Sequence, residues 1–199
     1  MLTPGRTHWP EEAHIKMHNL DSPRVRSTTV LAVRREGTLA FAGDGQVTID
    51  QTIFKNRAIK LRRLHDNRVL VGYAGAAADA LALFERLEGK LDEFSGNLPR
   101  ACLELVKQWR TDRALRQLQA LLIVGDKDHL LLVSGTGDLL VPDDDAVGIG
   151  SGGPYAQAAA LALLAHTDLP AERIAEEAVR IASRICVYTN EQITVEVLS

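Results

Sequence analysis

The sequence predicts an α+β fold, a four-layer αββα sandwich in which two antiparallel sheets stack face to face between outer helices. Strand-like apolar runs occur before a pair of amphipathic helical segments and again after it, and a second helical pair and a last strand complete the chain. Strands on both sides of a helical pair favour two sheets whose outer faces are covered by helices. With 199 residues, 46% of them hydrophobic, the chain is long enough for one globular domain with a sizeable core.

The first strands form a predicted hairpin. Two apolar runs, 28–34 and 38–42, flank Gly37, where glycine can supply the positive φ of a tight turn. Because paired strands of a hairpin run in opposite directions, Thr28 and Asp44 are expected at the same end of it.

The remaining elements follow from the period of their apolar residues. Alternation predicts strands, whereas apolar residues three and four positions apart predict helices. In chain order, we expect strands at 57–64 and 68–74, helices at 76–94 and 98–119, strands at 120–124, 129–134, 139–141 and 146–149, helices at 153–166 and 170–187, and a strand at 193–198.

Composition and charge exclude several classes of function. The formal net charge of −3 argues against a nucleic-acid binder. Two cysteines, Cys102 and Cys186, are too few for a disulfide framework and suit a reducing, cytoplasmic compartment. No apolar run approaches the ~18 residues that a membrane span needs, so no membrane association is expected.

Two sequence patterns bear on phosphate binding by this chain. The run 148–153 formally fits a dinucleotide fingerprint, but two helices follow it where a strand ending in an acidic residue is required. The chain also contains no glycine-rich loop ending in Gly-Lys-Ser or Gly-Lys-Thr. We therefore expect that this chain binds no nucleotide by itself.

Residues 1–27 are polar, interrupted by prolines and without the apolar core of a secretory signal. We interpret them as a leader or propeptide that is disordered or removed, ahead of a single domain at 28–199.

A threonine, a carboxylate and a lysine are predicted to converge at one end of a sheet. A threonine hydroxyl is a poor nucleophile unless a base lies beside it, and the α-amino group of an N-terminal threonine is such a base. After cleavage before Thr28, that amine would activate the hydroxyl, the Lys60 ammonium would lower the pKa values of both groups, and Asp44 would hold the ammonium. Alternatively, Thr28 is an ordinary strand residue, Asp44 belongs to a turn and Lys60 is a solvated charge. Spacing alone does not decide between a catalytic and a purely structural role.

Five stretches carry a family resemblance: TTVLAVRREGTLAFAGDGQVT from Thr28, KLRRL, VGYAGAAADALALFE, WRTDRALR and GIGSGGPYAQAAA. Together they resemble the HslV family, proteasome-like threonine peptidases that are the proteolytic subunits of bacterial two-component ATP-dependent proteases. The resemblance covers 28–199 in order and implies the sandwich of the N-terminal nucleophile hydrolases.

The resemblance also implies a catalytic set for a threonine endopeptidase. It makes Thr28 the nucleophile, with Asp44 and Lys60 beside it. Gly72 matches the position whose backbone N–H enters the oxyanion hole, and Ser151 matches a serine that hydrogen-bonds at the threonine's amino group.

A cation and an assembly are further implications. Ser183, Cys186 and Thr189 match a sodium site held by backbone oxygens, although the family usually has glycine where Ser183 stands. By resemblance, the chain forms a homo-oligomer, a double ring of hexamers, and the hexameric ATPase HslU docks on it and delivers unfolded protein substrates.

One feature departs from the family, in which the threonine usually follows the initiator methionine directly. Here Ser27 precedes Thr28, so either Thr28 removes the leader by attacking the preceding carbonyl, or the start codon lies too far upstream. Ser27 and Thr29 are rival nucleophiles, and Thr28 is preferred because it keeps the family's spacing to Lys60. Two other functions stay open: a small-molecule amidase of the same fold, and a catalytically silent ring subunit that keeps its leader.

Overall fold

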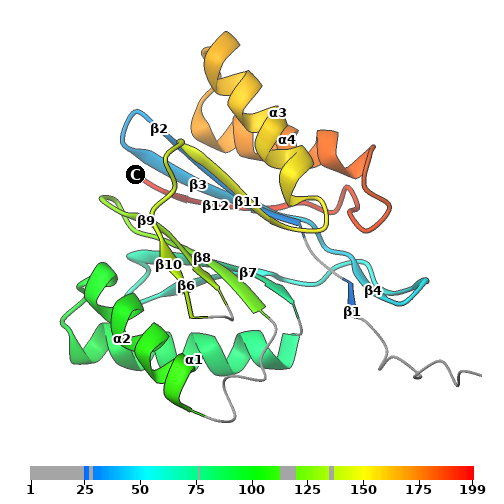
Figure 1. Cartoon of the computed structure of the whole chain (residues 1–199). Helices are drawn as coiled ribbons and strands as arrows, with labels where there is room; N and C mark the ends of the chain where they lie inside the picture. The colour runs from blue at the N-terminus through cyan, green and yellow to red at the C-terminus, as the bar shows by residue number, and fades with distance from the viewer. Residues whose placement is uncertain (1–24, 27–28, 76, 113–119, 135–136) are drawn as a thin grey trace, which may run out of the picture.

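Two antiparallel sheets lie face to face at the centre of the structure, and a pair of helices covers the outer face of each (Figure 1). The computed structural model describes residues 25–26, 29–75, 77–112, 120–134 and 137–199. The four-layer αββα sandwich predicted from the sequence is confirmed. The elements are β1 Val25–Arg26, β2 Thr29–Arg35, β3 Thr38–Gly43, β4 Val47–Ile49, β5 Thr52–Lys55, β6 Leu61–Leu64, β7 Val69–Gly75, α1 Ala77–Glu93, α2 Leu98–Thr111, β8 Ala120–Gly125, β9 Leu130–Ser134, β10 Leu139–Leu140, β11 Ala146–Gly150, α3 Gly153–His166, α4 Ala171–Ser183 and β12 Thr194–Leu198.

The first sheet has β2 and β3 at its centre, in the order β11-β2-β3-β12. The predicted turn between them is confirmed, because Glu36 (φ 52°) and Gly37 (φ 76°) both adopt the left-handed backbone of a two-residue hairpin turn. Helices α3 and α4 cover the outer face of this sheet, and small apolar residues of α4, such as Ala175 and Ala178, pack against it. The hairpin places the first residues of β2 beside the end of β3, since Val30 pairs with Gly43.

The second sheet has the order β10-β9-β8-β7-β6 and is covered by α1 and α2. Its inner face meets the first sheet in a core that includes Phe41, Leu70 and Ile123. Its outer face packs on the two helices around Trp109 and Leu105, which are fully buried. The sandwich is therefore held by three apolar layers, one between the sheets and one beneath each helical pair.

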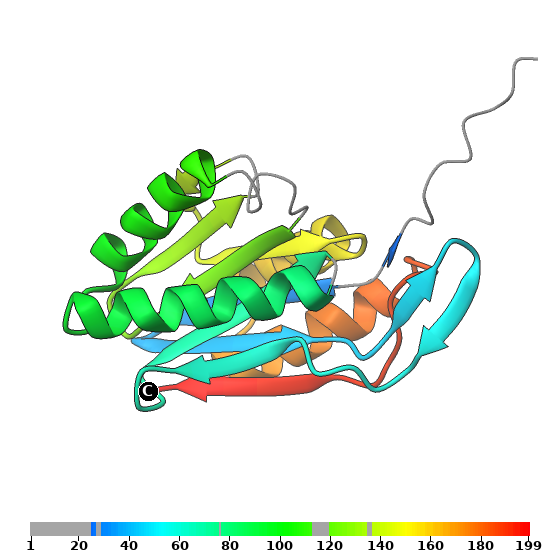
Figure 2. The ribbon, with the colours of Figure 1, turned by 90° about the horizontal axis from the view of Figure 1, so that it is seen from below.

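The strand predicted at 57–64 is shorter than expected, because β6 begins only at Leu61. Lys60 still accepts the N–H of Tyr73, but Ala58 donates its N–H to the carbonyl of Gly45 at 2.8 Å, away from β7. The short hairpin of β4 and β5, which projects from the end of the sandwich (Figure 2), was not predicted. Every residue of β5 is exposed, so this strand shows no alternation of buried and exposed residues.

Two helices also end earlier than predicted. Helix α2 ends at Thr111, and Asp112 has an extended backbone (φ −77°, ψ 122°), while 113–119 lie outside the described residues. Helix α4 ends at Ser183 rather than near 187, because the apolar residues beyond it do not continue the buried stripe. Ile185 and Val187 are 56% and 78% exposed.

Two residues of the predicted leader form a strand. Val25 and Arg26 make up β1, which pairs antiparallel with β4 opposite Ile49 and Thr48. The leader or propeptide at 1–27 stays a prediction, and 1–24 and 27 lie outside the described residues. In the part of the chain that the structure describes, none of the helices combines the length and apolar character needed to cross a membrane.

Candidate active site

Asp44 and Lys60 form a buried ion pair where β3 ends and β6 is about to begin. The Lys60 Nζ lies 2.6 Å from Asp44 Oδ1 and donates a second hydrogen bond to the carbonyl of Gln46 at 2.7 Å. Both residues are nearly inaccessible, with 1% of Asp44 and 2% of Lys60 exposed. The convergence predicted for this pair is observed, and a solvated lysine is excluded.

The Asp44 carboxylate is held by donors from three other segments. Its Oδ1 accepts the backbone N–H of Thr29 at 2.8 Å. Its Oδ2 accepts the N–H groups of Gln46 at 2.9 Å and Asn190 at 3.2 Å. A carboxylate with this many donors is fixed in orientation.

Burial and the adjacent carboxylate have opposite effects on the pKa of Lys60. Burial disfavours its charged form and lowers its pKa below the ordinary value of 10.5, while the adjacent Asp44 carboxylate opposes this shift. The ammonium therefore sits in a water-poor site where its field acts strongly on neighbouring groups.

Thr28 lies outside the described residues, but its bonded neighbour is well placed. Thr29 begins β2, and its backbone nitrogen is the donor to Asp44 Oδ1. The residue that directly follows Thr28 in the chain therefore contacts the ion pair through its backbone. Thr29 itself is fully buried, and its Oγ1 hydrogen-bonds to Thr189 Oγ1 at 2.7 Å. These contacts favour Thr28 over Thr29 as the nucleophile.

Ser151 directly follows β11, and the antiparallel register pairs Gly150 with Thr29. The side chain of Ser151 is therefore carried by the strand next to β2, at the end where β2 begins. It is exposed, so its hydroxyl is open to other groups at that end.

Gly72 has a different role from the one that the resemblance implies. It lies inside β7, opposite Leu61 of β6 and Ile123 of β8. The next residue, Tyr73, donates its N–H to the Lys60 carbonyl at 3.2 Å, on the β6 side. Successive N–H groups of a strand point to opposite sides, so the Gly72 N–H faces β8 and lies within the sheet. The expectation that it enters an oxyanion hole is therefore wrong.

The structure gives Gly72 a packing role between the two sheets. A Cβ at this position would lie 2.5 Å from Val30 Cγ1 and 3.1 Å from Leu61 Cδ2. We expect Gly72→Ala to lower the free energy of unfolding by about 1–3 kcal/mol, because the added methyl group overpacks a full core.

Urea unfolding measures this effect, and Gly89→Ala is the matched control. Gly89 lies within α1, and a Cβ there meets nothing within 4 Å. That substitution should raise stability by about 0.5–1 kcal/mol. Equal stability changes in the two variants would contradict the packing role of Gly72.

Gly75 is better placed than Gly72 to donate an N–H into the site. It lies two residues beyond Tyr73 on the same strand, so its N–H points to the same side. Among the described strands, β6 pairs with β7 only as far as Gly72. The last residues of β7, including Gly75, therefore extend beyond the start of β6. This free edge lies at the same end of the sheet as Lys60.

The three residues predicted to bind sodium lie at and after the end of α4. Ser183 is the last helical residue, and the chain then turns, with Cys186 N–H donating to Ala182 and Thr189 N–H donating to Cys186. Among the described residues, no three His, Cys, Asp or Glu side chains cluster as metal ligands. A cation here would rely on backbone carbonyl and hydroxyl oxygens, a donor set that suits a hard ion such as sodium.

Several site contacts carry no signal in the sequence. Asn190 and Thr189 meet Asp44 and Thr29 across more than a hundred residues of chain, and Gln46 meets Val187 in the same region. Gln46, Thr189 and Asn190 are ordinary polar residues outside helices and strands, so only the fold reveals their partners.

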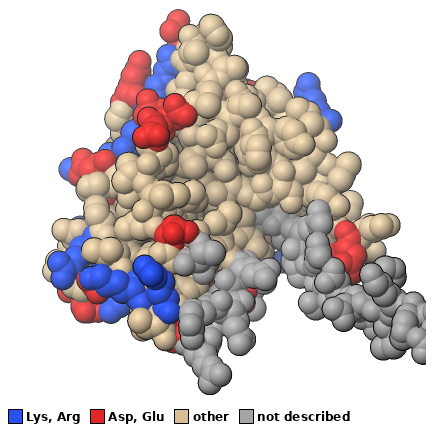
Figure 3. Space-filling model, in the orientation of Figure 1, with Lys and Arg blue, Asp and Glu red and all other residues tan. Residues whose placement is uncertain are grey.

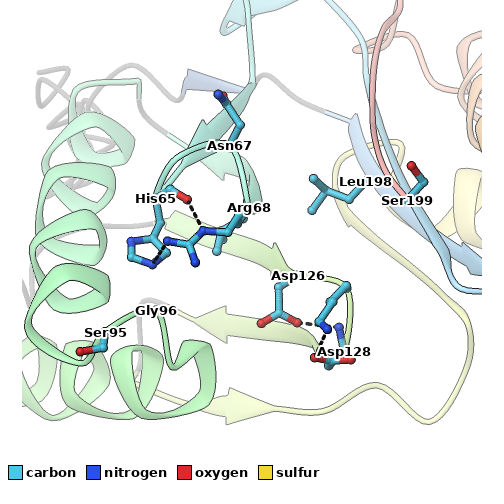
Figure 4. Close-up of a pocket in the computed structure, with 11 residues that line it drawn as sticks. His65, Asn67, Arg68, Ser95, Gly96, Asp126, Asp128, Leu198 and Ser199 are labelled. Carbon is cyan, nitrogen blue, oxygen red and sulfur yellow. Dashed lines mark hydrogen bonds and ion pairs between the residues drawn. The ribbon is translucent and has the colours of Figure 1, made fainter.

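A cavity of about 400 Å³ lies elsewhere, between the β6–β7, α1–α2 and β8–β9 connections and the C-terminus (Figure 4). It includes none of the predicted site residues. Its polar groups are largely paired with one another, as in the contact of 2.9 Å between Arg68 Nη2 and His65 Nε2. These pairs stabilise the surrounding loops.

Comparisons with known proteins agree with the fold. A family model described as proteasome subunit matches residues 25–198. The ATP-dependent protease subunit HslV of Petrotoga mobilis is 56% identical over 171 residues, which are 86% of this chain and 97% of that protein. The protein of the same name from Desulfovibrio desulfuricans is 56% identical over 173 residues, 86% of this chain and 98% of that protein.

Solved structures give the same result. Eukaryotic HslV from Trypanosoma brucei matches with a TM-score of 0.82 and 48% identity, over 86% of this chain and 99% of that chain. Thiobacillus denitrificans BPH, at 19% identity and a TM-score of 0.67 over 86% and 98% of the two chains, shares the fold. This chain therefore belongs to the proteasome subunit family and, within it, to the HslV proteins.

Proposed function

We propose that this chain is the threonine-type peptidase subunit of a two-component ATP-dependent protease and degrades unfolded proteins that a partner ATPase delivers. The observation that carries the proposal is the buried Lys60–Asp44 pair, which is hydrogen-bonded to the residue that follows Thr28. A buried, desolvated ammonium at the start of a strand is an arrangement that activates a neighbouring nucleophile.

The chemistry begins once residues 1–27 are removed and Thr28 has a free amine. The amine takes the proton from the Thr28 hydroxyl, whose oxygen attacks a peptide carbonyl to form a tetrahedral intermediate. The Lys60 ammonium lowers the pKa values of the amine and hydroxyl, and Asp44 keeps the ammonium in place. The intermediate collapses when the protonated amine gives its proton to the leaving amine, and water then hydrolyses the acyl-enzyme.

Two further groups complete this mechanism. The Gly75 N–H, at the free edge of β7, is the donor proposed for the oxyanion, in place of Gly72. Ser151, carried by the end of β11 beside Thr29, hydrogen-bonds to the Thr28 amine and orients it.

Assembly into a double ring of hexamers is part of the proposal, with the ATPase HslU as the partner. The relatives from Petrotoga and Desulfovibrio are named subunits of an ATP-dependent protease, and this chain has no nucleotide-binding loop of its own. Exposed large apolar residues support subunit contacts, among them Phe54 on β5 and Val187 after α4. On the face in Figure 3, charged side chains gather at the left, and uncharged residues cover the centre.

A sodium ion and a cytoplasmic location complete the proposal. The ion would be held by the carbonyl oxygens of Ser183, Cys186 and Thr189, and it would brace the turn that contacts Thr29 through Thr189. The cysteines Cys102 and Cys186 are both free thiols, in keeping with a reducing compartment.

We expect the purified protein, mixed with HslU and ATP, to release acid-soluble peptides from an unfolded, fluorescently labelled protein. Omitting either ATP or the ATPase should abolish this release, because the proposal assigns the ATP-driven delivery of substrate to the partner. Hydrolysis of small amides by a species with the native mass of a monomer or dimer would instead favour an amidase. Retention of the leader without any hydrolysis would favour a silent ring subunit.

A further inference from the structure

Asn190 joins three segments around the ion pair, although the proposed mechanism does not use it. It lies in the loop between α4 and β12. Its backbone N–H donates to Asp44 Oδ2 at 3.2 Å. Its side-chain Oδ1 accepts the N–H of Gly45 at 3.1 Å, and its Nδ2 donates to the carbonyl of Asn56 at 3.0 Å.

The side chain of Asn190 also shapes its own turn. The Oδ1 atom accepts the N–H of Gln192 at 3.1 Å, the local contact of an Asx turn. This contact orients the loop so that the backbone N–H of Asn190 faces Asp44. The side chain therefore controls a hydrogen bond that its own backbone makes to the carboxylate.

The residues just before Asn190 contact the same centre. The carbonyl of Val187 accepts Gln46 Nε2 at 2.9 Å, and Gln46 in turn supplies the carbonyl that receives the Lys60 ammonium. Thr189 Oγ1 meets Thr29 Oγ1 at 2.7 Å. The segment 187–190 thus touches the start of β2, the end of β3 and the loop that leads to Lys60.

The Asp44 carboxylate has to present Oδ1 to two groups at once, the Lys60 ammonium and the Thr29 amide. Its other oxygen, Oδ2, accepts the backbone N–H groups of Asn190 and Gln46, and these contacts fix the orientation of the carboxylate. Loss of the Asn190 side chain leaves Gly45, Gln192 and the Asn56 carbonyl without these partners. The loop is then held less firmly, its backbone N–H shifts relative to Oδ2, and the carboxylate and the ammonium shift with it.

We propose that Asn190 is a positioning residue of the active centre, which fixes Asp44 and, through it, the Lys60 ammonium beside Thr28. This inference rests on the proposed peptidase function, because it assigns Asn190 a part in the same centre. A residue that served only the stability of the fold would change the melting temperature without a specific effect on turnover.

The test compares Asn190→Ala, Asn190→Asp and Gln192→Ala in chains whose intact mass shows that they begin at Thr28. The substrate is a short fluorogenic peptide. We expect Asn190→Ala to lower kcat about tenfold or more, with little change in KM, because a small displacement of catalytic groups affects the transition state more than substrate binding. Asn190→Asp keeps the acceptor for Gly45 and Gln192 and should recover part of kcat.

Gln192→Ala is the matched control, since it removes an exposed amide side chain two residues away and keeps the backbone N–H that Asn190 accepts. It should match the wild type. Melting curves must show that every variant is folded at the assay temperature. An unchanged kcat in folded Asn190→Ala, or a loss confined to KM, would overturn the proposal.

A second measurement does not depend on activity. The Lys60 ammonium can be titrated by NMR in selectively labelled protein, with Lys60→Met for assignment. Asp44 is the charged group that the described residues place against Lys60, and its carboxylate opposes the effect of burial. A loosened Asp44 should therefore lower the pKa of Lys60 further in Asn190→Ala. If Asn190→Ala leaves the pKa of Lys60 unchanged, the positioning role is refuted. If Asn190→Ala shifts that pKa but the wild-type protein hydrolyses no peptide, only the proposed function is contradicted.

Discussion

Thr28→Ala is expected to abolish peptide hydrolysis and, in the same chain, removal of residues 1–27. Losing the nucleophile of a covalent mechanism typically costs about 10³-fold or more in turnover, because the remaining groups bind substrate without forming the acyl-enzyme. If Thr28 also attacks the carbonyl of Ser27, the variant keeps its leader. Intact-mass measurement of both proteins should show loss of 1–27 in the wild type and the full 199-residue chain in the variant.

Two neighbouring variants serve as controls for Thr28→Ala. Ser27→Ala removes a rival hydroxyl, and Thr29→Ser keeps the buried hydroxyl that contacts Thr189. Both should retain activity. Hydrolysis by Thr28→Ala, or its loss in Ser27→Ala, would assign the nucleophile to another residue. Loss of the leader in Thr28→Ala would show that a separate protease cleaves it.

The layers of the fold could be predicted because burial on one face repeats with a fixed period. Strand β7 and helix α1 are long and strongly patterned, and their positions were predicted to within a few residues. Strand β5 was missed because all four of its residues are exposed, so its pairing with β4 leaves no hydrophobic pattern. The predicted end of α4 was too late because Ile185 and Val187 are apolar but exposed.

The candidate site shows a similar division. The convergence of Asp44 and Lys60 could be predicted because Asp44 follows β3 and Lys60 directly precedes β6, so both lie at strand ends. The direction of the Gly72 N–H could not be predicted, because a motif match does not give the strand register. In the structure, the register makes this N–H face β8. Asn190 and Thr189 were missed for a third reason, because contacts across more than a hundred residues depend on the packed fold.

The second large effect is expected for the ion pair. Lys60→Met leaves the Asp44 carboxylate buried without its cation, which should cost about 3–5 kcal/mol of folding stability. The three backbone N–H groups that still contact Asp44 place the loss toward the lower part of that range. Asp44→Asn leaves a buried ammonium instead and should also destabilise the fold.

A double-mutant cycle separates coupling from catalysis. All unfolding curves are measured in the Thr28→Ala background, where every chain is expected to share one leader state. The variant with both Asp44→Asn and Lys60→Met should be more stable than the sum of the single changes predicts, by about 1–3 kcal/mol, because neither charge is then left unpaired. Simple additivity would mean that the pair is not coupled, despite its 2.6 Å contact.

Restored stability should not restore activity. With Thr28 intact, the double variant still lacks the ammonium that lowers the pKa values of the threonine amine and hydroxyl, so we expect a loss of about 10²–10³-fold in kcat. The wild type should show a bell-shaped pH profile whose acid limb reports the Thr28 amine. On the alkaline side, activity should be lost at a pH below 10.5, the ordinary pKa of lysine. Burial lowers the pKa of Lys60, and the site works only while that lysine is charged. A double variant with wild-type turnover would assign Lys60 to the fold alone and leave the amine of Thr28 as the sole activator of its hydroxyl.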